Sequence, residues 1–113
     1  MIKTKRVYLP AAKDDGARVL VDRLWPRGMT KQKAKLDLWL RDIAPSNELR
    51  KWYSHDPKKW PAFKRCFRSE LKDRRDLLKQ VKVLEKEKGT VTLLFSSKEE
   101  KLNNASALKE FLK

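Results

Sequence analysis

The sequence predicts a small α/β protein, in which a mainly parallel sheet of about four strands is flanked by helices in Rossmann-like layers. The first observation behind this prediction is alternation: short apolar, β-branched runs alternate with longer segments whose apolar residues recur at helical spacing. The second is size, because 113 residues fit one domain and can bury a core without disulfides or metals. The third is that no internal repeat or low-complexity linker divides residues 1–113, which we expect to form a single domain.

The first two strands are expected near the amino terminus. A short strand at residues 5–9 ends at Pro10, which has no N–H to donate to a strand ladder. Residues 17–24 form a nearly continuous apolar run after an Asp-Asp-Gly turn signal, a pattern typical of a strand buried on both faces. Pro26 and Gly28 then interrupt the pattern, so this strand leads directly into the stretch DRLWPRG.

Two further strands are expected later in the chain. Residues 90–95 contain the run VTLLF, which is the clearest strand pattern, and we expect them at the centre of the sheet. Residues 36–41 carry a leucine at every second position and favour a strand, although they could instead continue the preceding helix. As a strand, this segment would place Leu36, Leu38 and Leu40 on one face.

Helix starts are indicated by side chains that can cap a helix amino terminus. Short helices are expected at residues 31–35 and 48–53. Longer ones are expected after Pro57 and at residues 74–88, where Gly89 ends the helix. A last helix is expected near the carboxyl terminus. The candidate caps are Thr30, Ser46, Asp56 and either Asn103 or Asn104.

The apolar residues of the last three helices recur at helical spacing and identify their core-facing sides. The helix after Pro57 has the clearest pattern, because its charged residues fall on the other sides. The expected core residues are Trp60, Phe63, Phe67 and Leu71, then Leu77, Leu78, Val81 and Leu84, and finally Ala105, Leu108, Phe111 and Leu112.

Positive charge is the most prominent feature of the composition. Lysine and arginine number 29 against 15 acidic residues, which gives a formal net charge of +14. Such an excess favours anionic partners, namely nucleic acid, anionic lipid or a phosphorylated ligand. Much of it is lysine spread over the expected helix faces, however, and that pattern is typical of a solvated surface. The charge by itself therefore does not identify a partner.

The composition also limits the location and the chemistry of the protein. No apolar run of about 18 residues occurs, and the amino terminus lacks the apolar segment of a signal peptide. Cys66 is the single cysteine, so no internal disulfide can form, and no Cys/His spacing indicates zinc. No glycine-rich nucleotide-binding loop or serine-hydrolase motif is present. We expect a cytoplasmic protein without membrane association, metal or cofactor.

Two polar segments should meet at one edge of the sheet, because ligands of parallel α/β folds bind beyond the carboxyl ends of the strands. The stretch DRLWPRG, residues 22–28, follows the second strand, and a polar loop at residues 96–99 follows the last one. Arginine binds phosphate or carboxylate through two parallel hydrogen bonds, and exposed N–H groups at helix starts can add to such a site. We predict an anion-binding cleft here, with Ser97 and Lys98 nearby. Its predicted ligand-binding residues are Asp22, Arg23, Trp25, Arg27, Ser46, Arg50 and Asn103.

Each of these residues also has a structural interpretation. Asp22 and Arg23 can pair with each other, and Arg27 can cap a helix. Ser46 can be an ordinary helix cap. Trp25 can stack on a base or an aromatic ligand beside the arginines, or it can simply cover the turn.

Catalytic residues are less well indicated than ligand-binding ones. His55 is the single histidine and a candidate general acid or base, and Asp22 is the other candidate. The Asp56-Pro57 pair that follows His55 is fully explained as a helix start, however. Cys66 has several cations nearby that could lower the pKa of a thiol, but it fits better as a half-buried space filler.

Three stretches of the chain resemble a known family. They are RVLVDRLWPRG, LDLWLRDIAPSNELRKWYSHDPKKW and VTLLFSSKEEKLNNA, and with the spacing between them they cover nearly the whole chain. WPRG, and APSxELRKW followed by HDP, are specific motifs. On these the chain is identified as a member of the YeaO-like branch of the bacterial family of domains of unknown function numbered 488. The resemblance implies a small cytosolic α/β protein with no established activity.

The chain also departs from the family pattern. The family places an acid and then a histidine in the last motif, where this chain has Glu99 and Leu102. If that histidine were catalytic, this protein would be impaired. An aromatic hydroxyl is often found where Phe67 stands, and the pattern has no cysteine at the position of Cys66, which disfavours a nucleophile there.

Three functional hypotheses follow from the sequence. The first is an anion-binding cleft for a phosphate-bearing small molecule or a nucleic-acid end, in which Asp22 orients Arg23 and Arg27. The second is a nucleic-acid-binding module that uses basic helix faces and performs no chemistry. The third is a structural or interaction protein whose arginines pair internally with carboxylates. The identity of the ligand, the existence of a reaction and the oligomeric state are left open.

Overall fold

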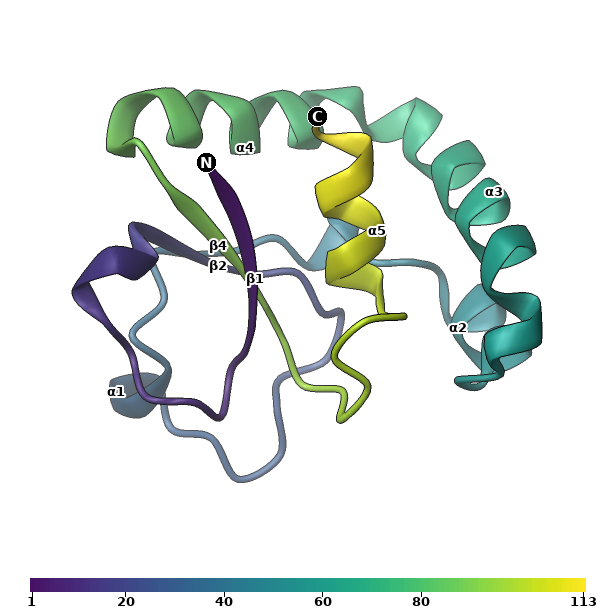
Figure 1. Ribbon diagram of the computed structural model, residues 1–113, viewed down its shortest axis with the longest axis horizontal. Coiled ribbons are helices and arrows are strands. Elements are labelled where there is room, and N and C mark those ends of the chain that lie inside the picture. The colour runs from purple at the N-terminus through teal and green to yellow at the C-terminus, as the bar shows by residue number, and fades with distance from the viewer.

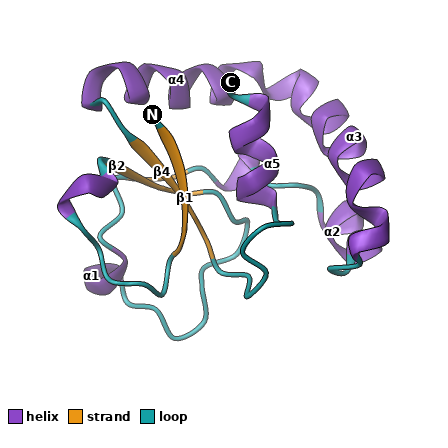
Figure 2. Cartoon of the chain, viewed as in Figure 1, coloured by secondary structure: helices purple, strands orange, loops and turns teal.

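Four parallel strands form the sheet (Figure 1; Figure 2), and the computed structural model describes residues 1–113. The strand order is β1-β4-β2-β3, and every neighbouring pair is parallel. All strands therefore end at the same edge of the sheet, and the predicted α/β fold with a parallel sheet is confirmed. The strands are β1 (Ile2–Arg6), β2 (Ala17–Leu20), β3 (Leu38–Trp39) and β4 (Val91–Phe95).

The helices lie around this sheet. They are α1 (Lys31–Ala34), α2 (Asn47–Tyr53), α3 (Trp60–Glu70), α4 (Arg75–Lys88) and α5 (Asn104–Phe111). Short 3₁₀ turns also occur: η1 (Lys13–Asp15), η2 (Arg41–Ile43), η3 (Pro57–Lys59) and η4 (Leu71–Arg74). In Figure 1, α4 runs along one end of the strands and α3 bends away from it toward α2, whereas α1 lies apart from the other helices. None of the helices combines the length and the hydropathy needed to cross a membrane.

Alternate side chains of the central strand β4 pack on opposite faces of the sheet, as strand geometry requires. Leu93 belongs to a core of 18 buried residues, which also contains Phe67 of α3. Leu94 belongs to a smaller group of four buried residues, which contains Ala34 of α1. Helices α2 to α5 thus cover one face, and α1 with its flanking loops covers the other. The prediction that residues 90–95 form a buried central strand is confirmed.

The first two strands have different bounds from those predicted. β1 begins at Ile2 rather than at residue 5, because it pairs along its whole length with β4. It is a half-buried edge strand that contains two lysines, so it lacks the apolar run that marks a central strand. β2 ends at Leu20 rather than at residue 24, and the DRLWPRG stretch is a loop from Asp22 onward.

The predicted strand at residues 36–41 is reduced to the two residues of β3. Lys35 adopts a left-handed conformation with φ 46° that ends α1, so the alternative of a continuing helix is wrong. Leu36 packs with the smaller buried group, whereas Leu38 and Leu40 pack in the larger core. The three leucines therefore do not share a face, because pairing with β2 begins only at Leu38 and Leu36 is not held in strand geometry.

Candidate functional site

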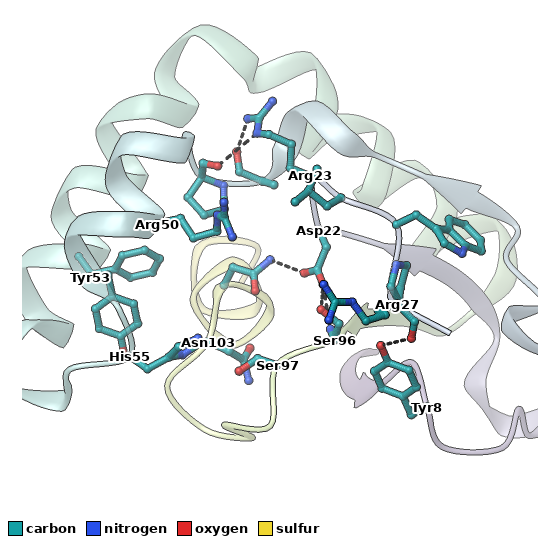
Figure 3. A pocket seen from close by; sticks show the side chains of 17 residues that line it. Tyr8, Asp22, Arg23, Arg27, Arg50, Tyr53, His55, Ser96, Ser97 and Asn103 are labelled. Carbon is teal, nitrogen blue, oxygen red and sulfur yellow. Dashed lines mark hydrogen bonds between the residues drawn. The ribbon is translucent and has the colours of Figure 1, made fainter. Parts of the chain in front are cut away.

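A cleft of about 420 Å³ opens at the carboxyl edge of the sheet (Figure 3). Its walls come from the residues that follow β1, β2 and β4, together with α2, the turn after it and the start of α5. The two segments predicted to meet at this edge, DRLWPRG and the loop after β4, both line the cleft. The cleft is therefore a product of the parallel topology, which brings three strand ends to one side of the molecule.

Asp22 lines the cleft and joins the elements that meet there. Its carboxylate accepts hydrogen bonds from the Ser96 backbone N–H at 2.8 Å and from the Ser96 hydroxyl at 2.7 Å. Asn104, the first residue of α5, donates its side-chain N–H to Asp22 at 3.1 Å and to the Val21 carbonyl at 3.0 Å. Asp22 thus links the ends of β2 and β4 to α5. No hydrogen bond connects it to Arg23 or Arg27, which it was expected to orient.

Arg23 is held in the wall of the cleft. Its guanidinium donates to the carbonyl of Ala44 at 3.0 Å and to that of Pro45 at 3.4 Å. It also lies 3.7 Å from the carboxylate of Asp42, which is 80% exposed. Arg23 therefore fits the hypothesis of internal pairing in part, and its donors serve the segment before α2.

Arg27 and Arg50 line the cleft differently from Arg23. Both side chains are exposed, and neither guanidinium makes a hydrogen bond or an ion pair within the protein. Arg27 is held only through its backbone, where its carbonyl accepts a hydrogen bond from the Tyr8 hydroxyl at 2.8 Å. In Figure 3, Arg50 enters from the α2 side of the cleft and Arg27 from the opposite side. The site therefore contains two free guanidinium groups that can bind an anion.

The other predicted ligand-binding residues have structural partners. The Ser46 hydroxyl does not line the cleft, because it donates to the Glu70 carboxylate at 2.6 Å and accepts the Leu49 N–H at 3.1 Å. Trp25 lines the cleft, but its indole N–H donates to the Met29 carbonyl at 2.7 Å. Ligand binding by these two residues stays a prediction.

Asn103 lines the cleft from the start of α5 and is only 3% exposed. Its side-chain oxygen accepts the Ser106 N–H at 2.9 Å, and its side-chain N–H donates to the Glu99 carbonyl at 2.7 Å. Asn103 is thus the cap of α5, whereas Asn104 is the residue that reaches Asp22. Ser97 also lines the cleft, but Lys98 does not.

Aromatic side chains form one end of the cleft. Tyr53 stacks on Phe63 with ring centroids 4.4 Å apart, and its hydroxyl donates to the Leu102 carbonyl at 2.9 Å. Burial raises the pKa of the Tyr53 hydroxyl, and the nearby carboxylates of Glu99 and Asp56 raise it further. Tyr53 therefore stays protonated and acts as a hydrogen-bond donor inside the protein.

His55 lines the same end of the cleft (Figure 3). It has a positive φ of 58°, follows Ser54 with φ 46°, and its exposed imidazole makes no hydrogen bond in the protein. The imidazole lies near the Glu99 carboxylate. That carboxylate has a lowered pKa, chiefly because it accepts the N–H groups of Lys101 and Leu102 and in smaller part because of His55. Catalysis by His55 or by Asp22 stays a prediction.

Four polar residues of the cleft were not among the predicted site residues: Tyr8, Tyr53, Ser96 and Asn104. Ser96 and Asn104 could have been found, because both lie at the ends of elements that meet at the carboxyl edge. Tyr8 gave no such signal, because it was expected inside a strand at residues 5–9, whereas β1 ends at Arg6 and Tyr8 lies in the loop after it.

Comparison with known proteins places the chain in a family. The family model described as the inactive DUF488-N3 subclade matches residues 1–113. The chain belongs to the DUF488 family. The uncharacterized protein YeaO of Escherichia coli is 40% identical to this DUF488 protein over 112 residues, which make up 99% of the chain and 96% of YeaO. The resemblance to the YeaO-like branch is therefore confirmed.

Mycobacterial proteins are also similar to this DUF488 chain. The uncharacterized proteins Rv3073c of Mycobacterium tuberculosis and Mb3100c of Mycobacterium bovis are each 44% identical to it over 72 residues. That match covers 64% of this chain and 61% of each mycobacterial protein, so it spans less than two thirds of their length. No solved structure matches the chain significantly.

Proposed function

We propose that this DUF488 protein binds a small phosphate-bearing ligand in the cleft at the carboxyl edge of its sheet. The observation that carries the proposal is the pair of guanidinium groups, those of Arg27 and Arg50, which line the cleft without any acceptor in the protein. A guanidinium whose donors are not used internally can give all of them to a phosphate, as two parallel charge-assisted hydrogen bonds.

The remaining polar groups of the cleft are compatible with an anion. The carboxylate of Asp22 already accepts three hydrogen bonds from Ser96 and Asn104, which stabilise its negative charge in place. Arg27 and Arg50 together carry more charge than this one carboxylate, and the protein as a whole carries +14. The field of the molecule therefore attracts an anion toward the cleft.

A binding role accounts for these features without a reaction. The matching subclade is described as inactive, and this chain has Leu102 where the family pattern places a histidine. The Asp22 carboxylate is engaged in joining β2, β4 and α5, which leaves it fewer free lone pairs for proton transfer. We therefore assign the cleft to ligand binding.

Calorimetric titration with inorganic phosphate at fixed ionic strength tests this proposal. We expect Arg27→Gln and Arg50→Gln each to weaken phosphate binding about tenfold or more, because a hydrogen bond to a charged group contributes roughly 1.5–3 kcal/mol. Neither arginine side chain has a partner in the protein, so both variants should unfold at the temperature of the wild type.

Arg65→Gln is the matched control for these two variants. Arg65 is an exposed cation on α3 that does not line the cleft, so this variant changes the net charge equally while leaving the cleft intact. Equal affinities for phosphate in all three variants, or no binding by the wild type, would contradict the proposal.

A second candidate function is nucleic-acid binding through the basic faces of α3 and α4. Arg65 of α3, Lys72 of the η4 turn between the helices, and Arg75 and Lys79 of α4 are exposed and form no ion pair with a carboxylate. Free cations at a surface are the contacts that bind phosphates of a nucleic acid without regard to sequence. This candidate differs from the first in its dependence on salt, which is considered below at the scale of the whole molecule.

A further inference from the structure

Large apolar side chains are exposed at the mouth of the cleft. Tyr8 is 39% exposed and Leu24 is 61% exposed, and both line the cleft beside Arg27. Leu9, next to Tyr8 in the chain, is 46% exposed. Single exposed apolar residues are ordinary, but a group of them at the rim of a cleft is typical of a surface that a ligand covers.

Tyr8 is fixed in position on two sides. Its hydroxyl donates to the Arg27 carbonyl at 2.8 Å, as the dashed line in Figure 3 shows. The guanidinium of Arg6 lies over the Tyr8 ring, 5.1 Å from the centroid, and donates to the carbonyl of Ser97 at 2.9 Å. These contacts attach the ring to both loops of the cleft. Little rotamer freedom is then left to lose when a ligand packs on it.

Arg6 lies over one face of the Tyr8 ring, and Tyr8 is nevertheless 39% exposed. An exposed aromatic face next to a free arginine is the combination on which nucleic-acid bases stack while their phosphates are held. Inorganic phosphate would use the arginines alone and leave Tyr8 and Leu24 uncovered.

We infer that the ligand of the cleft is a nucleotide, whose phosphate binds Arg27 and Arg50 and whose base stacks on Tyr8. This inference rests on the proposed function and extends it from phosphate to phosphate joined to a planar base. A free nucleotide and the phosphorylated end of a nucleic-acid strand both carry this chemistry, and the experiment below separates the two sources.

The experiment compares four probes in calorimetric titrations at fixed ionic strength: inorganic phosphate, adenosine, adenosine 5′-monophosphate and a 5′-phosphorylated DNA hexanucleotide. We expect adenosine 5′-monophosphate to bind at least about tenfold more tightly than phosphate or adenosine, because one stacked base contributes an effect of this size. Tyr8→Leu and Tyr8→Phe both remove the hydroxyl that donates to the Arg27 carbonyl, so Tyr8→Phe is the reference for Tyr8→Leu. Tyr8→Leu keeps an apolar side chain but removes the aromatic face, so it should abolish the preference for adenosine 5′-monophosphate over inorganic phosphate. Tyr8→Phe keeps the face and should retain most of the gain.

Trp52→Leu is the matched control for Tyr8→Leu. Trp52 is 44% exposed and has the ammonium of Lys59 over its ring at 5.0 Å, but it does not line the cleft. This variant therefore removes a similar exposed aromatic face elsewhere on the surface. It should bind all four probes as the wild type does.

The outcomes separate this inference from the proposed function. Equal affinities for phosphate and adenosine 5′-monophosphate, with Arg27→Gln weakening both, would overturn the nucleotide and leave phosphate binding in place. If Tyr8→Leu still binds adenosine 5′-monophosphate more tightly than phosphate, the base does not stack on Tyr8 and that assignment is overturned. No binding of any probe, or no effect of Arg27→Gln and Arg50→Gln, would overturn the proposed function and the inference with it. If the tighter binding of adenosine 5′-monophosphate depends on Tyr8, the hexanucleotide identifies the source of the ligand. Tighter binding of the hexanucleotide than of the mononucleotide assigns the ligand to strand ends, and the reverse order assigns it to free nucleotides.

Discussion

Two arginines illustrate how differently the same side chain is used in this protein. Arg18 is 4% exposed, and its guanidinium pairs with Asp15 and donates to the carbonyls of Ala34 and Lys35. Arg27 is exposed and donates to nothing. A buried guanidinium requires partners, because an unpaired buried charge is strongly destabilising, whereas an exposed one can remain free for a ligand. At the residue scale, Arg18 therefore belongs to the fold and Arg27 to the cleft.

Asp15 is a carboxylate that is only 4% exposed and is surrounded by hydrogen-bond donors. Its carboxylate receives hydrogen bonds from the Ala12 N–H at 3.0 Å and from Lys5 at 3.1 Å, besides the pair with Arg18. Burial by itself raises the pKa of the Asp15 carboxyl, but the Ala12 N–H, Lys5 and Arg18 outweigh burial and hold the pKa below its ordinary value. Asp15→Asn leaves Arg18 buried without its counter-charge, and we expect it to lower the free energy of unfolding by about 3 kcal/mol at pH 7.

The loss of stability in Asp15→Asn depends on pH, because the pKa of the Asp15 carboxyl is lowered in the folded protein. A carboxyl whose pKa is lowered in the folded state adds stability above its unfolded pKa and loses it as the pH falls through the folded value. The difference between wild type and Asp15→Asn in urea unfolding should therefore shrink as the pH falls below 3.8. Asp14→Asn is the control, because the Asp14 side chain is 80% exposed and pairs only with Lys3, and it should change stability little. A difference that is constant with pH would show that the Asp15 charge does not contribute.

At the scale of elements, α2 shows how a short helix is held in place. Helices of fewer than about 12 residues are marginal in isolation, and α2 spans only 7. Ser46 caps it by accepting the Leu49 N–H, and the carboxylate of Glu70 at the end of α3 accepts the Ser46 N–H at 2.8 Å and hydroxyl at 2.6 Å. The contact between the two helices therefore positions Arg50, which α2 carries into the cleft.

Removing the Glu70 carboxylate tests this link between α3 and α2. Glu70→Ala leaves the Ser46 N–H and hydroxyl without their acceptor, and we expect the free energy of unfolding to fall by about 1–3 kcal/mol in urea titrations. Asp73→Ala serves as the control, since Asp73 is exposed and makes no hydrogen bond or ion pair. If the two variants lose the same stability, the contact between Glu70 and Ser46 is not what holds α2.

At the scale of the whole molecule, the charge of +14 acts on any polyanion. On a surface that binds DNA only through its electrostatic field, each cation makes about one phosphate contact. The logarithm of the affinity then falls by about 0.9 per contact for each unit of the logarithm of the salt concentration. We expect a DNA duplex with 5′-hydroxyl ends to bind with this steep salt dependence. Arg27→Gln and Arg65→Gln should weaken its binding equally, because a blunt duplex without end phosphates does not enter the cleft.

A salt series of fluorescence polarisation measurements checks this expectation, with wild type and both variants side by side. A much larger loss for Arg27→Gln than for Arg65→Gln would mean that duplex DNA contacts the cleft directly. Affinity that hardly changes with salt would rule out binding through the charged surface altogether.

Local patterns predicted most elements because the physical signal lies within each segment. The apolar stripe predicted for the helix after Pro57 placed Phe63 and Phe67 of α3 and Leu71 of η4 in the core, and all three are buried. The cap of α2 was predicted correctly because the capping residue Ser46 and the N–H that it accepts, that of Leu49, are only three residues apart in the chain. Elements stabilised mainly by distant partners were misplaced: β1 depends on pairing with β4, and its own residues give little indication of a strand.

The candidate site divides in the same way. The sequence by itself determined the family, the parallel α/β fold and the carboxyl edge as the place where DRLWPRG and the loop after β4 meet, because strand periodicity and motifs are local properties. Only the tertiary structure decided which arginine is free. Arg23 reaches carbonyls 21 and 22 residues away and Arg27 reaches none, and such partners depend on which loops pack together. The same physical reason explains why Tyr8 stands beside Arg27. β1 and β2 both pair with β4, and this brings the loops that follow them together across 19 residues of sequence.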